Sequence, residues 1–193
     1  MAAAGSIERV IIAAPPGGED EAGEIAVARG VEAVVVPGGD HRSESVANAL
    51  AQVGSELLVV HDAARPLVPP ALIDEVVTRL AANDDVAGVI AAIPATDTIK
   101  EASVSRRVVR TPERSRMWVV QTPQAFRASS LREAFAEHAD DLATASDDAV
   151  LVERSGGEIL LQEASAQNIK VTTPLDLEVA ELLLAGRSPT ELF

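Results

Sequence analysis

The chain has 193 residues, no cysteine, and 30 acidic against 16 basic residues, which gives a net charge of -14. This length suits one sizeable core, and a hydrophobic fraction of 47% indicates a globular protein. The acidity argues against a broad nucleic-acid or anionic-membrane surface, since both need a basic face. The lack of cysteine excludes disulfides, thiolate nucleophiles and cysteine-ligated metals.

Metal and membrane signals are also missing from the sequence. The three histidines, His41, His61 and His138, are not spaced as a metal-binding pair on a helix, so we predict no protein-built metal site. No run approaches the roughly 20 apolar residues of a membrane span. The first residues lack the basic start and apolar core of a signal peptide. We therefore expect a cytoplasmic protein.

Strands and helices alternate in the first half of the chain. Apolar runs predict strands at residues 9–14, 32–36, 57–60 and 86–93. Turns rich in glycine and proline and amphipathic helices separate these runs, and the helix that begins at Pro70 has the clearest 3.6-residue period. This alternation predicts an α/β fold with a mostly parallel sheet that is covered on both faces.

The alternation is interrupted by an arm at about residues 97–121. The β-branched segments 97–100, 106–111 and 117–120 have no helix between them, which predicts antiparallel hairpins. Since an isolated ribbon is not stable alone, we expect the arm to lean on another subunit. The alternative is a flap that folds back onto its own domain.

The pattern resumes after Phe126. We predict a helix capped by Ser129 or Ser130, and a second helix capped by Ser146 that ends near Gly156. A strand at 158–161 and an extended segment at 168–172 follow, and a last helix has Thr173 as its cap. Since the sequence contains no linker or internal repeat, residues 1–193 are expected to form one domain with the arm attached.

The strand at 57–60 ends in ionisable residues, His61-Asp62-Ala63-Ala64-Arg65-Pro66. In open α/β sheets, ligands bind at such strand ends. Asp62 could hold a sugar hydroxyl, and Arg65 could grip a phosphate or a carboxylate. The alternative is that Asp62 and Arg65 form only a salt bridge.

Three further features could bind a ligand, and each has a structural alternative. Gly38-Gly39-Asp40 could let a base or ribose approach the backbone, or could be a tight turn with Ser43 as a helix cap. Lys170 could be a phosphate ligand or a surface lysine with a buried stem. Arg114 could reach a neighbouring subunit's pocket or be an exposed turn arginine.

Several motifs taken together resemble one family, 2-C-methyl-D-erythritol 4-phosphate cytidylyltransferase of the non-mevalonate route to isoprenoids. The resemblance runs from about Ile7 to Leu184. Its motifs are Gly38-Gly39-Asp40 with Arg42 and Ser45, His61-Asp62-Ala63-Ala64-Arg65-Pro66, Asp97-Thr98-Ile99-Lys100, Thr122-Pro123-Gln124 and Asn168-Ile169-Lys170-Val171-Thr172. It implies a Rossmann-like nucleotidyltransferase fold and a homodimer that forms through the arm.

The resemblance also implies a reaction. The phosphate of methylerythritol phosphate attacks the α-phosphate of CTP, which gives CDP-methylerythritol and pyrophosphate. Because the nucleophile is already an anion, catalysis would rest on alignment and on cations, helped by Mg²⁺ bound mainly through the CTP phosphates.

Residue roles follow from the same resemblance. Lys170 and Arg114 would position methylerythritol phosphate, with Arg114 and Thr98 reaching across from the partner subunit. The substrate contacts it implies are Gly39, Asp40 and Ser45 at cytosine, and Asp62 and Ala63 at the ribose. Asp62 would also share the methylerythritol hydroxyls, with Arg65 supporting that cleft, and Thr122 and Ser146 match further substrate-side positions. The family often has threonine at the position of Ser146.

One departure concerns the start of the chain. Family members begin with a strand and a glycine-rich loop of the type Ala-Ala-Gly-x-Gly-x-Arg, followed by Pro-Lys, which cradles the CTP phosphates. Ala3-Ala4-Gly5-Ser6 resembles only the opening of this loop. We therefore expect neighbouring strands to lack a partner and CTP turnover to be greatly weakened. Alternatives are a cytidylyltransferase for another polyol phosphate, such as ribitol phosphate, or a non-catalytic binding or assembly protein.

Overall fold

The computed structural model describes residues 1–186, and the backbone alone of Thr144. The helices are α1 (Glu19–Ala28), α2 (Arg42–Leu50), α3 (Pro70–Ala81), α4 (Ala128–Glu137), α5 (Asp148–Arg154) and α6 (Pro174–Ala185), with 3-10 turns η1 (Arg114–Arg116) and η2 (Ala139–Thr144). The strands are β1 (Val10–Ala14), β2 (Ala33–Pro37), β3 (Leu57–Val60), β4 (Gly88–Pro94), β5 (Glu101–Ala102), β6 (Val108–Arg110), β7 (Trp118–Arg127) and β8 (Ile159–Glu163).

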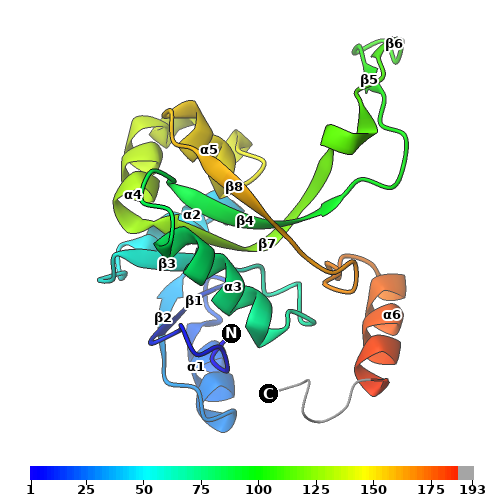
Figure 1. Cartoon of the computed structure of the whole chain (residues 1–193). Coiled ribbons are helices and arrows are strands. Elements are labelled where there is room, and N and C mark those ends of the chain that lie inside the picture. Colours follow the sequence, from blue (N-terminus) through cyan, green and yellow to red (C-terminus); the bar gives the residue numbers. More distant parts are fainter. Residues whose placement is uncertain (187–193) are drawn as a thin grey trace.

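The strands form a main sheet and two smaller pairs (Figure 1). The main sheet has the order β3-β7-β4-β8, in which β4 and β8 are parallel and β7 runs antiparallel to both β3 and β4. A separate parallel pair consists of β1 and β2. The α/β prediction is confirmed, and the sheet is mixed because of the single reversed strand β7.

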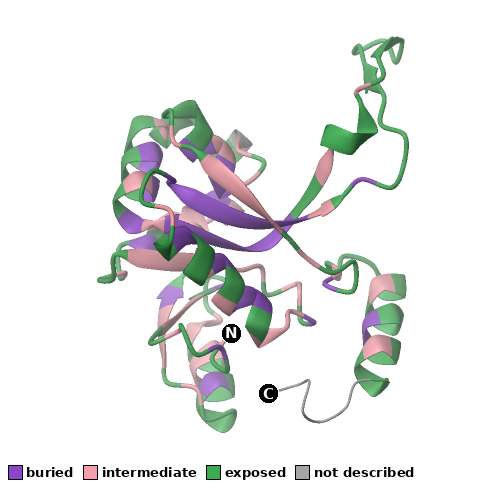
Figure 2. Ribbon diagram, in the orientation of Figure 1, coloured by how far each residue is buried: buried purple, intermediate pink, exposed green. Residues whose placement is uncertain are grey.

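Helices cover both faces of the main sheet because successive strand residues point to opposite sides. On one face, Val89 and Ala125 pack with α3 side chains such as Val76 and Leu80. On the other face, Ile90 and Phe126 pack with buried residues of α4 and α5 and with Leu50 of α2. The purple central strands in Figure 2 mark this doubly covered core.

An irregularity in β7 lies where the functional residues gather. The register with β4 runs from Gly88 opposite Phe126 to Ile90 opposite Gln124, and resumes with Ala92 opposite Val120. Residues 121–123 therefore bulge out of the ladder, which explains how Pro123 is accommodated in a central strand. At the bulge, the Thr122 side chain contacts the Asp62 amide after β3, and the Gln121 side chain contacts Asn168 in the loop after β8.

A cavity separates the β1-β2 pair from the main sheet. Within residues 1–186, β1 pairs with β2 alone and β3 is an edge strand beside β7. The cavity has a volume of about 1040 Å³, and residues 7–13 and 57–64 line it on facing sides. On the edges that face the cavity, β1 and β3 each lack a neighbouring strand among residues 1–186, which agrees with the expectation. Backbone groups along these edges are left to water or to a ligand.

Two segments stand away from the core. The β5-β6 hairpin projects beyond the ends of β4 and β7, and Figure 2 shows it almost entirely exposed. Helix α6 also lies to one side, with Leu175, Leu177 and Leu182 exposed. Among the helices of residues 1–186, none combines the length and the apolar character that a bilayer crossing would require.

Element boundaries agree with the sequence predictions for most of the chain, but three helix caps do not. Asp147 caps α5 by accepting from the Val150 amide at 3.0 Å, so the cap lies one residue after the predicted Ser146. Ser129 and Ser130 lie inside α4 instead of capping it. Helix α2 begins after His41, so Ser43 is not a cap. Thr173 caps α6 as predicted, with Asp176 completing a capping box.

Candidate functional site

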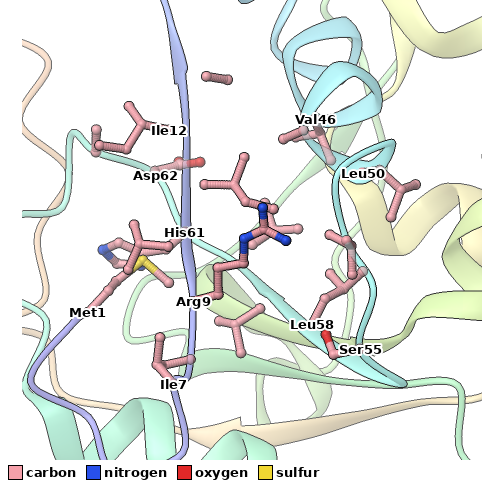
Figure 3. Close-up of a pocket in the computed structure, with 18 of the residues that line it drawn as sticks. Met1, Ile7, Arg9, Ile12, Val46, Leu50, Ser55, Leu58, His61 and Asp62 are labelled. Carbon is pink, nitrogen blue, oxygen red and sulfur yellow. The ribbon is translucent and has the colours of Figure 1, made fainter. Parts of the chain in front are cut away.

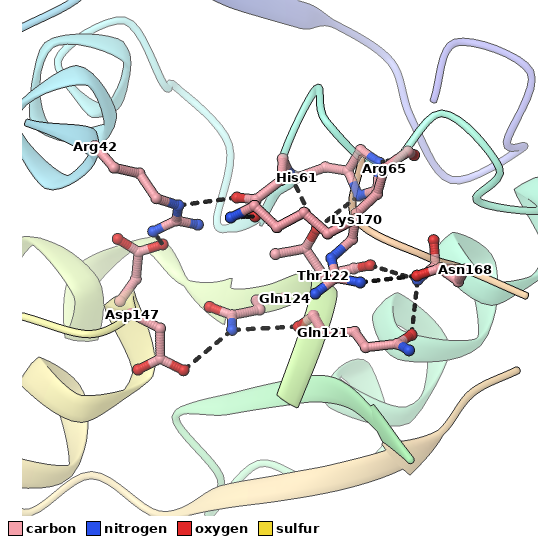
Figure 4. A network of polar contacts seen from close by, with 11 residues as sticks. Arg42, His61, Arg65, Gln121, Thr122, Gln124, Asp147, Asn168 and Lys170 are labelled. Atoms are coloured by element: carbon pink, nitrogen blue, oxygen red, sulfur yellow. Dashed lines mark hydrogen bonds and ion pairs between the residues drawn. The ribbon is translucent and has the colours of Figure 1, made fainter. Parts of the chain in front are cut away.

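The end of β3 is fixed by a chain of hydrogen bonds through His61 (Figure 4). The Asp62 amide donates to the Thr122 hydroxyl at 3.0 Å, and this hydroxyl lies 3.0 Å from His61 Nδ1. Since the hydroxyl accepts from the amide, its own proton is best donated to Nδ1. The other nitrogen, Nε2, then carries the ring proton and donates to the Arg65 carbonyl at 3.1 Å. Burial lowers the pKa of His61, in agreement with this neutral form.

The segment that carries Lys170 is tied to the same strand end. The Val171 amide donates to the Ala64 carbonyl at 2.7 Å, and Arg65 Nη1 donates to the Asn168 carbonyl at 2.8 Å. The buried Asn168 amide group donates to Gln121 Oε1 and to the Thr122 carbonyl, each at 2.9 Å. These contacts hold the loop after β8 against the β7 bulge.

Asp62 lies between two cations. Arg42 Nε is 2.8 Å from Asp62 Oδ1, and Lys170 Nζ is 2.9 Å from Asp62 Oδ2. Burial by itself would raise the pKa of Asp62, but hydrogen bonds from Lys170 and Arg42 outweigh it, so this pKa lies below its ordinary value. The alternative of a simple Asp62–Arg65 salt bridge is wrong, because the partners of Asp62 are Arg42 and Lys170 and the Arg65 side chain is turned to Asn168.

Behind Arg42 lies a second acid, Asp148, at the start of α5. Arg42 Nη1 is 2.8 Å from Asp148 Oδ2, and the Asp148 side chain is fully buried. Both pKa values are raised, for different reasons. The pKa of Arg42 is raised because the two nearby acids, Asp148 and Asp62, outweigh the effect of its burial. The pKa of Asp148 is raised because burial outweighs the attraction of Arg42. Burial of an acid without full compensation is costly.

The glycine turn after β2 is shaped by its neighbours. The Gly39 amide donates to Ser45 Oγ at 3.0 Å, and this hydroxyl also lies 3.2 Å from the His41 carbonyl. A Cβ atom at Gly39 would lie 2.3 Å from Glu44 Cβ, so a larger residue does not fit. Asp40 is exposed beside this turn. The tight-turn interpretation is therefore correct as a description of the backbone, while a base-binding role for Asp40 remains a prediction.

The turn side chain Ser45 and the strand end open into the same cavity. The predicted residues that line it are Ser45, Asp62, Ala63 and Lys170, together with Arg42. Figure 3 shows Arg9 of the β1 segment extending into this cavity from the side opposite β3. The arrangement combines a half-exposed lysine, a paired carboxylate and an apolar wall, which suits a ligand with hydroxyl and phosphate groups.

Other predicted residues lie elsewhere. Arg114 and Thr98 are exposed in the arm, where Arg114 donates to the Thr96 carbonyl at 3.0 Å. Ser146 is exposed next to the Asp147 cap. Residues Gly5 and Ser6 lie against α3, where Ser6 donates to Asp74 through its amide at 2.8 Å and its hydroxyl at 2.6 Å. This opening segment, which resembles the start of a phosphate loop, is thus held by α3 and not by Asp62.

Sequence reasoning did not assign a role to four members of this network, His61, Gln121, Asp148 and Asn168. For Asp148 a signal was present, because the residues that follow it, Ala149, Val150 and Leu151, are apolar, and an acid in such surroundings is seldom fully buried without a partner. Over residues 1–186, no group of three or more His, Cys, Asp or Glu side chains gathers as a metal site.

Comparison with known proteins places these features in a family. The sequence profile of 2-C-methyl-D-erythritol 4-phosphate cytidylyltransferase matches residues 1–186. An enzyme of that name from Parasynechococcus marenigrum is 44% identical over 154 residues, covering 79% of this chain and 67% of the relative. The corresponding protein of Streptomyces avermitilis is 38% identical over 199 residues, covering 97% of this chain and 78% of the relative.

Solved structures agree. The 2-C-methyl-D-erythritol 4-phosphate cytidylyltransferase of Thermus thermophilus superimposes with a TM-score of 0.76 at 35% identity, covering 92% of this chain and 82% of that one. The 4-diphosphocytidyl-2C-methyl-D-erythritol synthase of Anaerococcus prevotii gives a TM-score of 0.86 at 26% identity, covering 95% and 82%. Sequence and fold lead to the same conclusion: the chain belongs to the 2-C-methyl-D-erythritol 4-phosphate cytidylyltransferase family.

Proposed function

We propose that this chain transfers the cytidylyl group of CTP to 2-C-methyl-D-erythritol 4-phosphate at the end of β3. A phosphate oxygen of the polyol phosphate attacks the α-phosphorus of CTP, the bond from this phosphorus to the bridging oxygen breaks, and pyrophosphate leaves. The products are 4-diphosphocytidyl-2-C-methyl-D-erythritol and pyrophosphate. The observation that carries the proposal is the Asp62–Lys170 pair at the cavity that Ser45 also lines.

Lys170 is the proposed ligand of the attacking phosphate. Its side chain is 43% exposed, and its ammonium group has three donors, of which Asp62 Oδ2 accepts one. A phosphate that enters the cavity can therefore bind Lys170 without a rearrangement of the backbone. The positive charge would align the nucleophile and offset the repulsion between two phosphates.

Asp62 and Ala63 are the proposed contacts for hydroxyl groups of the ribose and the polyol. A low pKa keeps Asp62 ionised and therefore an acceptor near neutral pH. Arg65 supports this wall from behind through its bond to Asn168. Thr122 is buried and contacts the Asp62 amide, so its proposed role is to hold Asp62 in place.

The Gly39 turn is the proposed site of the cytosine ring. Glycine at position 39 lets this turn pack tightly against Glu44, which fixes the backbone next to Asp40 and Ser45. Asp40 and Ser45 lie at this turn and can supply acceptors to the exocyclic amine of cytosine. Ser146, exposed before α5, is a further proposed substrate contact.

Magnesium is the proposed cofactor, held mainly by the phosphate oxygens of CTP. Nucleotide-bound Mg²⁺ takes phosphate oxygens together with one or two carboxylates and water, and the acids that line this cavity are Asp62 and Glu8. The ion would neutralise charge on the triphosphate when bound. The residues of the chain orient the sugar hydroxyls and the attacking phosphate.

The arm is the proposed dimer contact, and Arg114 and Thr98 are proposed to complete the site of the partner subunit. Exposed valines on β6, Val108 and Val109, would be covered in such a dimer. Mixed dimers test this idea. If an Arg114→Ala chain is combined with a Lys170→Ala chain, half of the dimers are mixed and each has one intact site, so about a quarter of wild-type activity should return. No recovery would place Arg114 outside the partner's site.

The reaction itself is tested by pyrophosphate release from CTP and Mg²⁺ with different acceptors. We expect a greatly weakened but measurable release with methylerythritol phosphate, and at most a few per cent of that rate with ribitol phosphate, the acceptor of the main alternative. Asp62→Asn should lower the release strongly but leave it measurable. Equal rates with both acceptors would support a different polyol specificity. Binding of neither CTP nor polyol phosphate would support a non-catalytic assembly role.

A further inference from the structure

Four charged side chains alternate in sign from the core to the cavity. Asp148 contacts Arg42 at 2.8 Å, Arg42 contacts Asp62 at 2.8 Å, and Asp62 contacts Lys170 at 2.9 Å. Along the row, the exposed fraction of the side chains is 0% at Asp148, 34% at Arg42, 12% at Asp62 and 43% at Lys170. The row therefore has a buried end at α5 and a solvent-facing end at the proposed phosphate ligand.

The buried end is not explained by stability. Asp148 lies among the core residues Ala149, Leu151 and Val152, and its Oδ1 atom is buried without a hydrogen-bond partner among the described residues. A well-packed apolar residue at such a position is often at least as stabilising as a buried ion pair. The cap of α5 does not require Asp148 either, because Asp147 already provides it.

Arg42 links the buried Asp148 to Asp62 and in this way fixes the orientation of the Asp62 carboxylate. It donates through Nε to Asp62 and through Nη1 to Asp148, so two acids define the plane of one rigid guanidinium group. Without Asp148, the guanidinium group could rotate away and Asp62 would keep only its contact with Lys170. That contact is the one that an incoming phosphate would compete for.

We propose, as a deepening of the proposed function on which it rests, that Asp148 and Arg42 are positioning residues that hold the Asp62 carboxylate in place when Lys170 turns to the substrate phosphate. Neither residue needs to contact substrate in this role. Asp62 then presents the same oxygen to the substrate hydroxyls before and after Lys170 is engaged.

A double-mutant cycle tests the proposal. Asp148→Asn keeps the size of the side chain and removes the charge, and we expect kcat/KM for methylerythritol phosphate to fall between about tenfold and 100-fold. In an Asp62→Asn background, the same change should have less than about a twofold effect, because its target is gone. An equal loss in both backgrounds would overturn the proposal, since it would indicate general damage.

Two further variants sharpen the cycle. Asp147→Asn is the matched control, because asparagine still caps α5 and the residue does not contact Arg42; it should keep activity within about twofold. Arg42→Gln is made in the Asp148→Asn background, so that no buried charge is left unpaired. It should add little to Asp148→Asn. A large additional loss would assign Arg42 a direct role and contradict the positioning role of Asp148.

Failure of the proposed function can be separated from failure of this inference. If the wild-type chain releases no pyrophosphate with any acceptor, the proposed function is wrong. Rotation of the Arg42 guanidinium group, followed by NMR in the ligand-free protein, still tests the inference. We expect slow rotation in the wild type and in Asp147→Asn, and fast rotation in Asp148→Asn. Equally fast rotation in all three proteins would overturn it.

Discussion

Lys170 Nζ donates to Asp62 Oδ2 across 2.9 Å, so the proposed phosphate ligand is held by the proposed hydroxyl acceptor in the ligand-free molecule. The two residues come from segments more than 100 positions apart in the sequence. They meet because Val171 and Asn168 are hydrogen-bonded to Ala64 and Arg65 in the turn that follows β3. This meeting point is the basis of the predictions that follow.

Replacement of Lys170 by alanine should lower kcat/KM by about 100-fold to 1,000-fold, the usual effect of removing one preorganised donor to a charged transition state. Arg154→Gln is a matched control, because Arg154 is 44% exposed and also pairs with an acid, Asp141, but lies on the far part of α5. Steady-state pyrophosphate release measures both. Equal losses in the two variants would remove Lys170 from the site.

Gly39→Ala should disturb the proposed cytosine turn. The added Cβ would lie 2.3 Å from Glu44 Cβ, so the backbone has to move, at a cost of about 1–3 kcal/mol in unfolding free energy. Affinity for CTP, measured by calorimetry, should fall with it. Gly23→Ala on α1 is the control, since a Cβ there would meet only Val35 Cγ2, at 3.9 Å. Unchanged CTP affinity in Gly39→Ala would separate this turn from the nucleotide.

Stability should fall as the pH drops below about 6.5, the ordinary pKa of histidine. Because burial lowers the pKa of His61, the unfolded chain takes up a proton at a higher pH than the folded chain does. The unfolding free energy therefore decreases toward acid pH, by at most about 1.4 kcal/mol per pH unit from this one group. Well above pH 6.5, His61 is uncharged in both states and the effect disappears.

Urea denaturation between pH 5 and 7.5 measures this dependence. His61→Gln, whose amide can still donate to the Arg65 carbonyl, should flatten the curve. Asp148, with its raised pKa, contributes in the opposite direction, because the folded chain takes up that proton first. The difference between wild type and variant isolates His61. Parallel curves would show that His61 does not titrate differently in the two states.

The proposed dimer should depend on the exposed arm. Val108→Asp together with Val109→Asp places charges on β6 and should weaken self-association at least tenfold in sedimentation experiments. Val27→Asp, on the exposed side of α1, should leave it unchanged. A wild-type chain that remains monomeric at micromolar concentration would contradict the arm contact.

Local patterns were sufficient to predict most elements. The apolar runs of β1 to β4 and the Thr173-Pro174 start of α6 encode their structure within a few residues. Strand β7 was missed over half of its length. Its centre, Thr122-Pro123-Gln124, has a proline and polar side chains, and only the bulge against β4 makes these compatible with a central strand.

The candidate site was predicted in part, for a related reason. Asp62 and Lys170 were identifiable because each is a charged residue at the end of an apolar or extended segment. Their true partners were not, since Arg42 and Asp148 reach Asp62 only through the tertiary packing of α2 and α5. The salt bridge suggested by proximity in sequence, Asp62 with Arg65, is replaced by these distant partners.

A crystal structure of the chain with CTP, Mg²⁺ and methylerythritol phosphate would test the central claim most directly. We predict that the polyol phosphate lies within hydrogen-bond distance of Lys170 Nζ, that the cytosine ring rests on the Gly39 turn, and that Asp62 keeps its contact with Arg42. A polyol phosphate bound away from Lys170, or a cytosine ring outside the cavity lined by Ser45 and Asp62, would contradict the account.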